Sequence, residues 1–339
     1  MADLFNRPIA VLGAGSFGTA LAILLARNGN QTILWGRDSA QVKQISLNGE
    51  NQRYLPGVKL PEKLQVTADF NQAVANAFDI LVVTPSYAFS ETLQQIRQIK
   101  QKQDDLRIIW ACKGLEPETS EFLDTRVIEI LGENCPKAVL SGPTFAKELA
   151  VGSPTAITLG ADDGNFASDL SQRLVNDTFR VYLSSDLKGV QFGGAFKNIV
   201  AIGAGIADGL GFGANARTAL ITRGLAEMMR MGEKLGGRKE TFTGMAGLGD
   251  LILTCTDDQS RNRRFGLAIG KGATIEKAAN EIGQVVEGVR NTKEVKHLAE
   301  MHGVDMPICQ AIYGILYLDQ DPKQVARQLL TRTLKVEGD

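Results

Sequence analysis

The sequence predicts an α/β fold, in which a doubly wound, mostly parallel sheet is followed by an all-helical second domain. Three observations predict it: a strand–turn–helix–strand unit at the start, short apolar runs that alternate with helical patterns up to about residue 187, and helical patterns alone after that. Strands that alternate with helices form parallel sheets covered on both faces. We expect a first domain at residues 1–189 and a second at 190–339.

The composition is that of a globular enzyme, with 44% hydrophobic and 22% charged residues in a chain of 339. A formal net charge of −1 gives no basic field, so we expect neither nucleic acid nor a membrane surface as partner. No apolar run approaches the roughly 18 residues of a membrane span, and the first residues lack a secretory signal pattern. The 4 cysteines are scattered, which indicates buried thiols, no metal site and a cytoplasmic protein.

The first unit carries a glycine motif between a strand and a helix, which is the context in which such a motif indicates dinucleotide binding. Residues Ile9–Leu12 form an apolar run, which breaks at Gly13-x-Gly15-x-x-Gly18 and resumes as a helical pattern through Arg27. Gly13 permits the tight turn, Gly15 lets the backbone approach a pyrophosphate, and Gly18 lets the helix pack on its strand. The helix start offers unpaired N–H groups to phosphates. The unit predicts a Rossmann-type dinucleotide site, and the alternative is a glycine-rich turn in another βαβ unit.

The end of the second strand bears on the choice of dinucleotide. The run Thr32–Trp35 is followed by Gly36, Arg37 and Asp38. An arginine at this point accommodates the 2′-phosphate of NADP(H), whereas a carboxylate binds the ribose hydroxyl of NAD(H). Arg37 favours NADP(H), but Asp38 would bind the ribose if the strand ended one residue later. We therefore expect NADP(H) or NAD(H) as cofactor.

Six further apolar runs predict the remaining strands: residues 66–68, 80–84, 107–112, 138–140, 156–159 and 180–183. Helical patterns lie between several of them: residues 40–48, 90–100 and 121–131. Ligands of such sheets bind outside the carboxyl ends of the strands. Lys113 follows one strand end, and the turn with Gly142 and Thr144 follows another, so these residues are expected to face the same crevice as Gly15. A solvated Lys113 is the alternative.

The second domain carries a lysine in a segment that is otherwise apolar and rich in glycine, residues 189–201. Each interior glycine costs a helix roughly 1 kcal/mol relative to alanine, which predicts a packing or ligand reason for it. Gly193, Gly194 and Lys197 share one helical face, with Asn198 beside it. A desolvated Lys197 would have a lowered pKa and serve as general acid or base, and the alternative is a lysine that reaches solvent.

Two later segments offer partners for this lysine and for a phosphate. Asp250 opens the apolar run DLILTC, where it either caps a helix or pairs with Lys197, and Thr254 lies one helical turn later. The run SRNRR at residues 260–264 is a dense set of donors that suits a phosphate dianion, although a surface basic patch is the alternative. Glu287 has no role by spacing alone.

Seven motifs occur in this order over nearly the whole chain: GAGSFGTALA, a strand end with Lys113-Gly114, SGPTFAKE, FGGAFKNIVAIGAGIADGL, GLGDLILTC, SRN and VVEG. In this order they resemble the bacterial NAD(P)-dependent sn-glycerol-3-phosphate dehydrogenase family. The resemblance implies a Rossmann domain followed by a helical domain of the 6-phosphogluconate dehydrogenase type, and a homodimer. It also implies reversible reduction of dihydroxyacetone phosphate to sn-glycerol 3-phosphate, which supplies glycerophospholipid synthesis.

The resemblance further implies a role for each matching residue. Lys197 matches the proton donor, Asp250 its catalytic partner, and Lys113 the lysine that contacts substrate near the nicotinamide. The substrate contacts are Lys113, Gly142, Thr144, Lys197, Asn198, Asp250, Thr254 and the phosphate clamp Ser260, Arg261 and Asn262. The cofactor contacts are Gly13, Gly15, Ser16, Phe17, Gly18, Arg37, Lys113, Ala146, Arg261, Val285 and Glu287.

These residues imply hydride transfer to the substrate carbonyl while protonated Lys197 stabilises the oxygen and donates the proton. A cation already lies where a metal would act, so no metal is expected. One alternative is a different oxidoreductase on the same architecture, such as a 6-phosphogluconate or 3-hydroxyacid dehydrogenase, against which the 260–262 cluster argues. Another alternative is a dinucleotide-binding sensor without turnover. The presence of all three catalytic candidates, Lys113, Lys197 and Asp250, argues against it.

Overall fold

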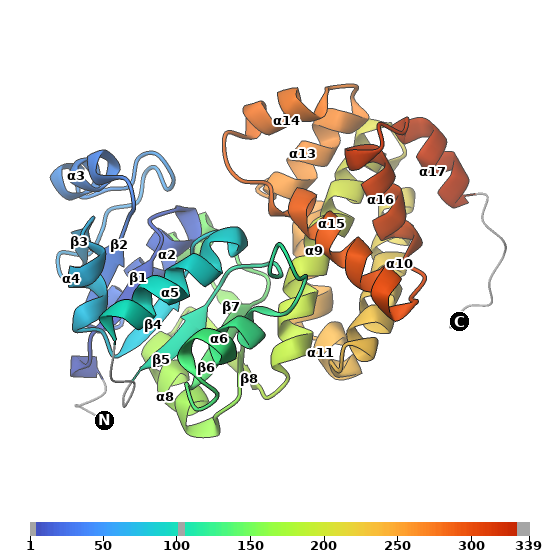
Figure 1. The fold of residues 1–339 in the computed structure, drawn as a ribbon. Helices are drawn as coiled ribbons and strands as arrows, with labels where there is room; N and C mark the ends of the chain where they lie inside the picture. The colour runs from blue at the N-terminus through green and yellow to red at the C-terminus, as the bar shows by residue number, and fades with distance from the viewer. Residues whose placement is uncertain (1–4, 101–105, 331–339) are drawn as a thin grey trace.

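The chain folds into an α/β half and a helical half (Figure 1). The computed structural model describes residues 5–100 and 106–330, so the outer ends of the two predicted domains, 1–4 and 331–339, lie outside the described residues. Within the described part, every strand precedes residue 187 and only helices follow it. The predicted fold class is confirmed.

The eight strands follow the apolar runs of the sequence. They are β1 (Ile9–Leu12), β2 (Thr32–Trp35), β3 (Gln65–Thr67), β4 (Asp79–Val82), β5 (Arg107–Trp110), β6 (Lys137–Ser141), β7 (Thr155–Ala161) and β8 (Phe179–Ser184). Their order in one sheet is β3-β2-β1-β4-β5-β6-β7-β8. The first six strands are parallel, whereas β7 pairs antiparallel with β6 and β8 runs parallel to β7. The sheet is therefore mostly parallel, with two reversed strands at one edge.

Helices cover both faces of this sheet. They are α2 (Ser16–Arg27), α3 (Ser39–Asn48), α4 (Phe70–Ala75), α5 (Phe89–Ile99), α6 (Leu123–Leu131), α7 (Ala146–Val151) and α8 (Gly164–Leu174), with a short 3₁₀ turn η1 (Ser86–Ala88) before α5. Successive side chains of a strand point to opposite faces. Ile9 and Val11 of β1 accordingly pack in the core that contains α2, while Ala10 and Leu12 pack in the core that contains α4, α5 and α6.

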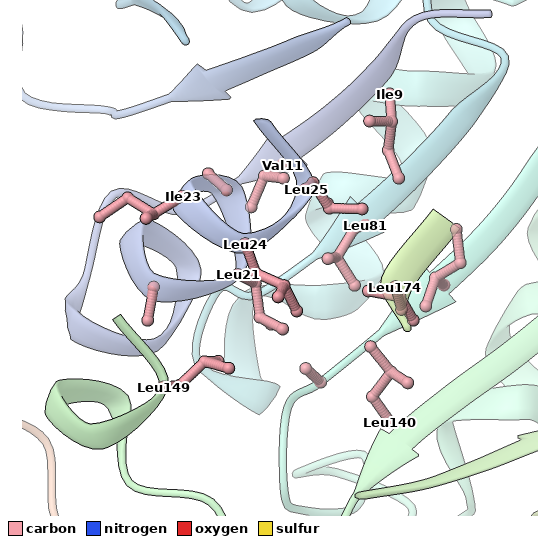
Figure 2. Close-up of a cluster of buried hydrophobic side chains, with 14 of the residues drawn as sticks. Ile9, Val11, Leu21, Ile23, Leu24, Leu25, Leu81, Leu140, Leu149 and Leu174 are labelled. Carbon is pink, nitrogen blue, oxygen red and sulfur yellow. The ribbon is translucent and has the colours of Figure 1, made fainter. Parts of the chain in front are cut away.

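Figure 2 shows the core on the α2 side of the sheet, where side chains from strands and helices interlock. The labelled residues come from β1, β4 and β6 and from α2, α7 and α8: Ile9, Val11, Leu21, Ile23, Leu24, Leu25, Leu81, Leu140, Leu149 and Leu174. Full burial of each such aliphatic side chain contributes about 1.5–3 kcal/mol. This packing fixes α2 on its strand, and with it the glycine turn that joins them.

The helical half is built around α9 (Leu187–Gly209). Packed on it or around it are α10 (Gly213–Lys234), α11 (Lys239–Thr243), the π-helical segment η2 (Met245–Gly249), α12 (Asp250–Thr256), α13 (Arg261–Gly270), α14 (Ile275–Ile282), α15 (Glu287–His302), α16 (Pro307–Tyr317) and α17 (Pro322–Leu330). By length and composition α9 is apolar enough to cross a membrane, but 94% of its apolar window is buried inside the protein. Figure 1 shows α9 at the junction of the two halves, enclosed by α10, α13, α15 and α16.

The predicted domain boundary, between residues 189 and 190, falls within the first turn of α9. Leu187 and Val190 pack in a core of the sheet, whereas Phe192 and Phe196 pack in the core of the helical half. One continuous helix therefore joins the two halves. The division of the chain at residue 189 stays a prediction.

Candidate active site

A cleft of about 1230 Å³ lies between the two halves, outside the carboxyl ends of β1, β4 and β5. Its walls come from the glycine turn, from these strand ends and from α9, α12, α13 and α15. All the predicted site residues except Gly142 line it. Residues far apart in the sequence thus meet in one place, while their individual roles stay predictions.

The three glycines of the turn have different surroundings. Gly13 has a φ of +127°, and a Cβ there would lie 2.8 Å from the Val83 carbonyl oxygen. A Cβ at Gly18 would lie 1.9 Å from the Gly13 carbonyl oxygen, so the protein's own packing requires both glycines. A Cβ at Gly15 would meet nothing within 4 Å. The start of α2 is therefore open to the cleft at Gly15, where free N–H groups and the helix dipole suit a pyrophosphate.

Two threonine hydroxyls on the cleft wall are buried and have no hydrogen-bond partner among the described residues. Thr84 follows β4, and Thr144 follows β6. An unsatisfied buried polar group costs about 1–3 kcal/mol. Both positions therefore suit a ligand that supplies the missing partner. From the sequence, a ligand contact is predicted for Thr144 but not for Thr84.

At the end of β2, the structure shows the contacts of Asp38. The strand ends at Trp35, and the Asp38 carboxylate accepts from the backbone N–H groups of Ala40 (3.0 Å) and Gln41 (3.1 Å) as the N-cap of α3. Its second oxygen lies 3.7 Å from the guanidinium of Arg53. The strand therefore ends at the predicted residue and not one residue later, while ribose binding by Asp38, which also lines the cleft, stays a prediction. Arg37 and Arg53 both line this end of the cleft.

The centre of the cleft holds one carboxylate between two ammonium groups. Asp250 opens α12, and its Oδ1 accepts from Lys197 Nζ of α9, while its Oδ2 accepts from Lys113 Nζ at 2.8 Å. Lys197 Nζ also donates to Thr254 Oγ1 at 2.8 Å. The N-cap position of α12 is occupied by Gly249, so Asp250 does not cap the helix through its side chain. The predicted Asp250–Lys197 pair is present in the structure.

Burial governs the charge state of this cluster. It lowers the pKa of Lys197 to about 7, an effect that Asp250 opposes and Lys113 reinforces. Lys197 is only 6% exposed, which excludes the alternative of a lysine that reaches solvent. Burial alone would raise the pKa of Asp250, but the two ammonium groups hold it below its ordinary value. The carboxylate stays ionised at neutral pH, while Lys197 can gain or lose a proton there, as general acid–base chemistry requires.

The glycines inside α9 destabilise the helix, so a compensating packing reason is predicted for them. The structure shows this reason. A Cβ at Gly193 would lie 2.5 Å from the Ala246 carbonyl oxygen of η2, and one at Gly194 would lie 2.6 Å from Ser141 Oγ at the end of β6. These glycines let α9 approach both segments closely. They thereby bring Lys197 to the cleft wall, next to a π-helical turn of the kind often found at functional sites.

Gly142 does not line the cleft but contacts Lys113, which does. Its carbonyl oxygen accepts from Lys113 Nζ at 3.4 Å, and the Lys113 ammonium also lies 6.0 Å from the centre of the Phe17 ring. Gly142 has a φ of +157°, and a Cβ there would lie 3.1 Å from the Ile157 Cα, so the turn itself requires glycine. The structure thus gives Gly142 a contact with Lys113 in place of the predicted cleft position.

The first turn of α13 carries the predicted phosphate clamp. The Ser260 hydroxyl accepts from the Arg263 N–H at 3.2 Å as the N-cap, so it holds the helix start. Arg261 is exposed at the cleft, where it donates to Gln284 Oε1 at 3.2 Å, and Asn262 is buried at the cleft wall. Arg263 is itself buried. The run is therefore not a simple surface patch, because Arg261 and Asn262 line the cleft whereas Arg263 is buried in the interior.

Helix α15 begins at Glu287, which lines the cleft. Burial raises the pKa of Glu287, against the opposing effects of Arg261 and Lys113. On the same face, one and two turns further on, lie Asn291 and Glu294, both buried. No role is predicted for them from the sequence. Their spacing of four and seven residues from Glu287 is the signal that points to a shared face.

Comparison with known proteins assigns the family. The model of the NAD-dependent glycerol-3-phosphate dehydrogenase N-terminus matches residues 8–167, and that of the C-terminus matches residues 186–327. A glycerol-3-phosphate dehydrogenase (NAD(P)+) from Photobacterium profundum is 55% identical over 330 residues, which cover 97% of each chain. The corresponding protein from Pseudoalteromonas translucida is 56% identical over 330 residues, covering 97% of this chain and 98% of its own.

A solved structure agrees with these matches. The crystal structure of glycerol-3-phosphate dehydrogenase from Coxiella burnetii superposes with a TM-score of 0.94 at 47% identity, covering 97% of this chain and 100% of its own. The likeness extends over both halves of the molecule and over the cleft between them. The chain belongs to the NAD-dependent glycerol-3-phosphate dehydrogenase family.

Proposed function

We propose that this protein catalyses the reversible reduction of dihydroxyacetone phosphate to sn-glycerol 3-phosphate with NAD(P)H. The Lys113–Asp250–Lys197 cluster carries the proposal, because it places an ionisable lysine in a cleft that also holds a glycine turn and a basic helix start. The ionisable lysine suits a carbonyl substrate, the glycine turn suits a dinucleotide, and the basic helix start suits a phosphate group.

The cleft fits a nicotinamide dinucleotide. The open backbone at Gly15 and the unpartnered hydroxyls of Thr84 and Thr144 are groups that a ligand would satisfy. The residues proposed to hold it are the turn at 13–18 with Ser16 and Phe17, together with Arg37, Lys113, Ala146, Arg261, Val285 and Glu287. When bound, the nicotinamide supplies the hydride in the reductive direction.

Lys197 is proposed as the proton donor to the substrate oxygen. Its ammonium stabilises the negative charge that develops there and then transfers a proton, and in the oxidative direction the neutral amine accepts the proton from the alcohol. Asp250 holds both lysines in place, and Lys113 adds a second positive charge at the same carboxylate. With Thr254 as a further partner, the orientation of the Lys197 ammonium is set before substrate arrives.

The α13 start is proposed to bind the phosphate that does not react. Arg261 offers a guanidinium and Asn262 an amide at the cleft, while Ser260 caps the helix. Binding energy gained at this phosphate positions the carbonyl against Lys197 and so contributes to the rate. Glycerophospholipid synthesis as the use of the product, a cytoplasmic location and a homodimeric assembly are proposed from the family resemblance.

The test is the initial rate of NADPH oxidation and, separately, of NADH oxidation with dihydroxyacetone phosphate at matched enzyme concentration. We expect turnover with both cofactors and a kcat/KM at least about tenfold higher with NADPH, because Arg37 and Arg53 line the end of the cleft while Asp38 caps α3. Folded protein that binds cofactor but gives no turnover with either would favour a different substrate or a sensor function.

A further inference from the structure

A chain of four hydrogen-bonded polar side chains crosses the helical half behind the cleft. It runs from Asn262 of α13 through Asn198 of α9 to Asn291 and Glu294 of α15. The donor–acceptor distances along it are 2.9, 3.0 and 3.1 Å. The four residues are 9%, 3%, 0% and 2% exposed, respectively. Polar groups at this depth are stable only when hydrogen-bonded, which gives the chain a definite geometry.

The two ends of the chain fix its direction. The Gly288 N–H donates to Asn262 Oδ1 at 2.9 Å, and a backbone N–H can only donate. At the other end, Glu294 Oε2 accepts from Asn291 Nδ2 and from the Leu115 N–H at 3.4 Å. Each amide between these ends therefore points its oxygen toward Gly288 and its nitrogen toward Glu294. A reversed amide would bring two donors or two acceptors face to face.

This direction decides what the cleft wall offers to a ligand. Asn198 and Asn262 line the cleft, whereas Asn291 and Glu294 do not. Both N–H groups of Asn198 are used, one by Asn291 and the other by the Gly194 carbonyl at 3.3 Å. Asn262 Nδ2 donates one hydrogen to Asn198, which leaves its second hydrogen for the cleft.

We propose that Asn291 and Glu294 are positioning residues that hold the Asn262 amide with its N–H toward the substrate phosphate. The inference rests on the function proposed above. A turned Asn262 amide would present its carbonyl oxygen to a phosphate dianion, and that contact is repulsive. The close backbone approach supports this arrangement, because a Cβ at Gly288 would lie only 2.7 Å from Asn262 Oδ1 and would displace the end of the chain.

Glu294, the last residue of the hydrogen-bonded chain, can be replaced by a residue that keeps the direction of the hydrogen bonds. Glu294 accepts both of its hydrogen bonds at Oε2, while its Oε1 has no partner among the described residues. Burial raises the pKa of Glu294 to about 7, against the donors Asn291 and Leu115, so a neutral side chain is tolerated there. A glutamine presents its oxygen where Oε2 lies and its amide nitrogen where Oε1 lies. Leucine keeps a similar bulk but accepts nothing.

The experiment compares Asn291→Ala, Glu294→Leu and Glu294→Gln with the unchanged protein. The measured quantities are the KM for dihydroxyacetone phosphate, the inhibition constant of inorganic phosphate, the KM for the cofactor and the melting temperature. In Asn291→Ala and Glu294→Leu we expect the first two constants to rise together by about 5–10-fold, which is the net effect of losing one ordinary hydrogen bond. The cofactor KM should stay within about twofold, and Glu294→Gln should restore both phosphate-dependent constants.

Glu227→Gln is the matched control. Glu227 is also a buried carboxyl in the helical half, and it accepts from the Ile308 and Cys309 N–H groups, but it does not line the cleft. This variant should lower the melting temperature without a selective change in the phosphate-dependent constants. Unchanged constants in Asn291→Ala, or an equal rise in the cofactor KM, would overturn the inference. Failure of the proposed function would show in the unchanged protein, as absence of turnover.

Discussion

Asp250 is the residue on which the charge balance of the site depends. Its carboxylate is 1% exposed and accepts from two ammonium groups, so removal of either lysine leaves it paired with the other. Breaking a buried pair outright costs about 3–5 kcal/mol, because it leaves an uncompensated charge. The double pairing therefore allows each lysine to be tested for function without leaving the carboxylate alone.

Lys197→Ala is expected to lower kcat for dihydroxyacetone phosphate by about 10²–10⁴ while the cofactor KM changes little. The reason is that Lys197 is the proposed proton donor, whereas the glycine turn proposed to bind the cofactor joins β1 to α2 in the other half of the molecule. Steady-state kinetics measure both constants. Lys188→Ala, which removes an exposed lysine from the first turn of the same helix, is the matched control and should keep its kcat. A Lys197→Ala variant with full kcat would remove this residue from the mechanism.

The pH dependence of the reaction follows from the pKa of Lys197, which burial lowers to about 7. Reduction requires the protonated form, so kcat/KM for dihydroxyacetone phosphate should fall as the pH rises through about 7. Asp250 opposes the effect of burial. In Asp250→Asn the pKa of Lys197 should therefore drop further and the falling limb should move to lower pH. Rate profiles from about pH 5 to about pH 9 measure this, and a limb that stays or moves upward would contradict the assignment.

At the scale of elements, the site depends on how closely α9 and α13 cross. A Cβ at Gly205 of α9 would lie 2.0 Å from the Arg263 carbonyl oxygen, and one at Gly266 of α13 would lie 2.0 Å from the Ile202 carbonyl oxygen. The two helices thus meet backbone to backbone. Their crossing sets the distance between the lysine carried by α9 and the phosphate clamp carried by α13.

Gly266→Ala should push these helices apart. We expect a loss of about 1–3 kcal/mol in the free energy of unfolding from overpacking, together with a raised KM for dihydroxyacetone phosphate. Urea unfolding and steady-state kinetics measure the two effects. Gly164→Ala at the start of α8 is the control, since a Cβ there meets nothing within 4 Å. Equal behaviour of the two variants would show that the close crossing does not position the clamp.

The elements themselves were largely predictable from local patterns. Apolar runs located all eight strands, most clearly β1, β4 and β5, because parallel strands that are buried along their whole length are nearly continuous in hydrophobicity. The reversed direction of β7 was not predictable, since the run at 156–159 has the same appearance whichever way the strand lies. The boundary near residue 189 is difficult for a related reason: α9 continues through it, so no linker composition marks the change of core.

The site residues were predictable where a reactive side chain comes directly after a strand, as Lys113 does, or begins a helix, as Asp250 does. It was less predictable where the partner comes from a distant helix. The structure shows that the Ser260 hydroxyl caps α13, a role that the sequence did not indicate, while its phosphate contact stays a prediction. Asn291 and Glu294 carry no motif, and only the packing of α9, α13 and α15 shows their hydrogen-bonded chain. Their spacing places Asn291 and Glu294 on one face of α15, but the sequence has no local signal for their pairing with α9 and α13.

For the whole molecule, the important contrast is between overall charge and cleft charge. The chain has a formal net charge of −1. Among the described residues that line the cleft, seven basic side chains face four acidic ones: Arg37, Arg53, Lys113, Lys147, Lys197, Arg261 and Arg264 against Asp38, Glu91, Asp250 and Glu287. A cleft with low-dielectric walls and an excess of one sign focuses the field, and it attracts substrates of the opposite sign.

This contrast predicts that capture of dihydroxyacetone phosphate depends on salt. Raising sodium chloride from about 0.05 M to about 0.5 M shortens the screening length from more than about 10 Å to less than about 8 Å, so kcat/KM should fall several-fold. The kcat at saturating substrate should change little, because the bound complex has already been formed. Arg264→Gln removes one exposed charge at the cleft and should make the salt dependence shallower. If salt lowered kcat and kcat/KM equally, the effect would lie in the chemical step or in stability, and the cleft field would have no part in substrate capture.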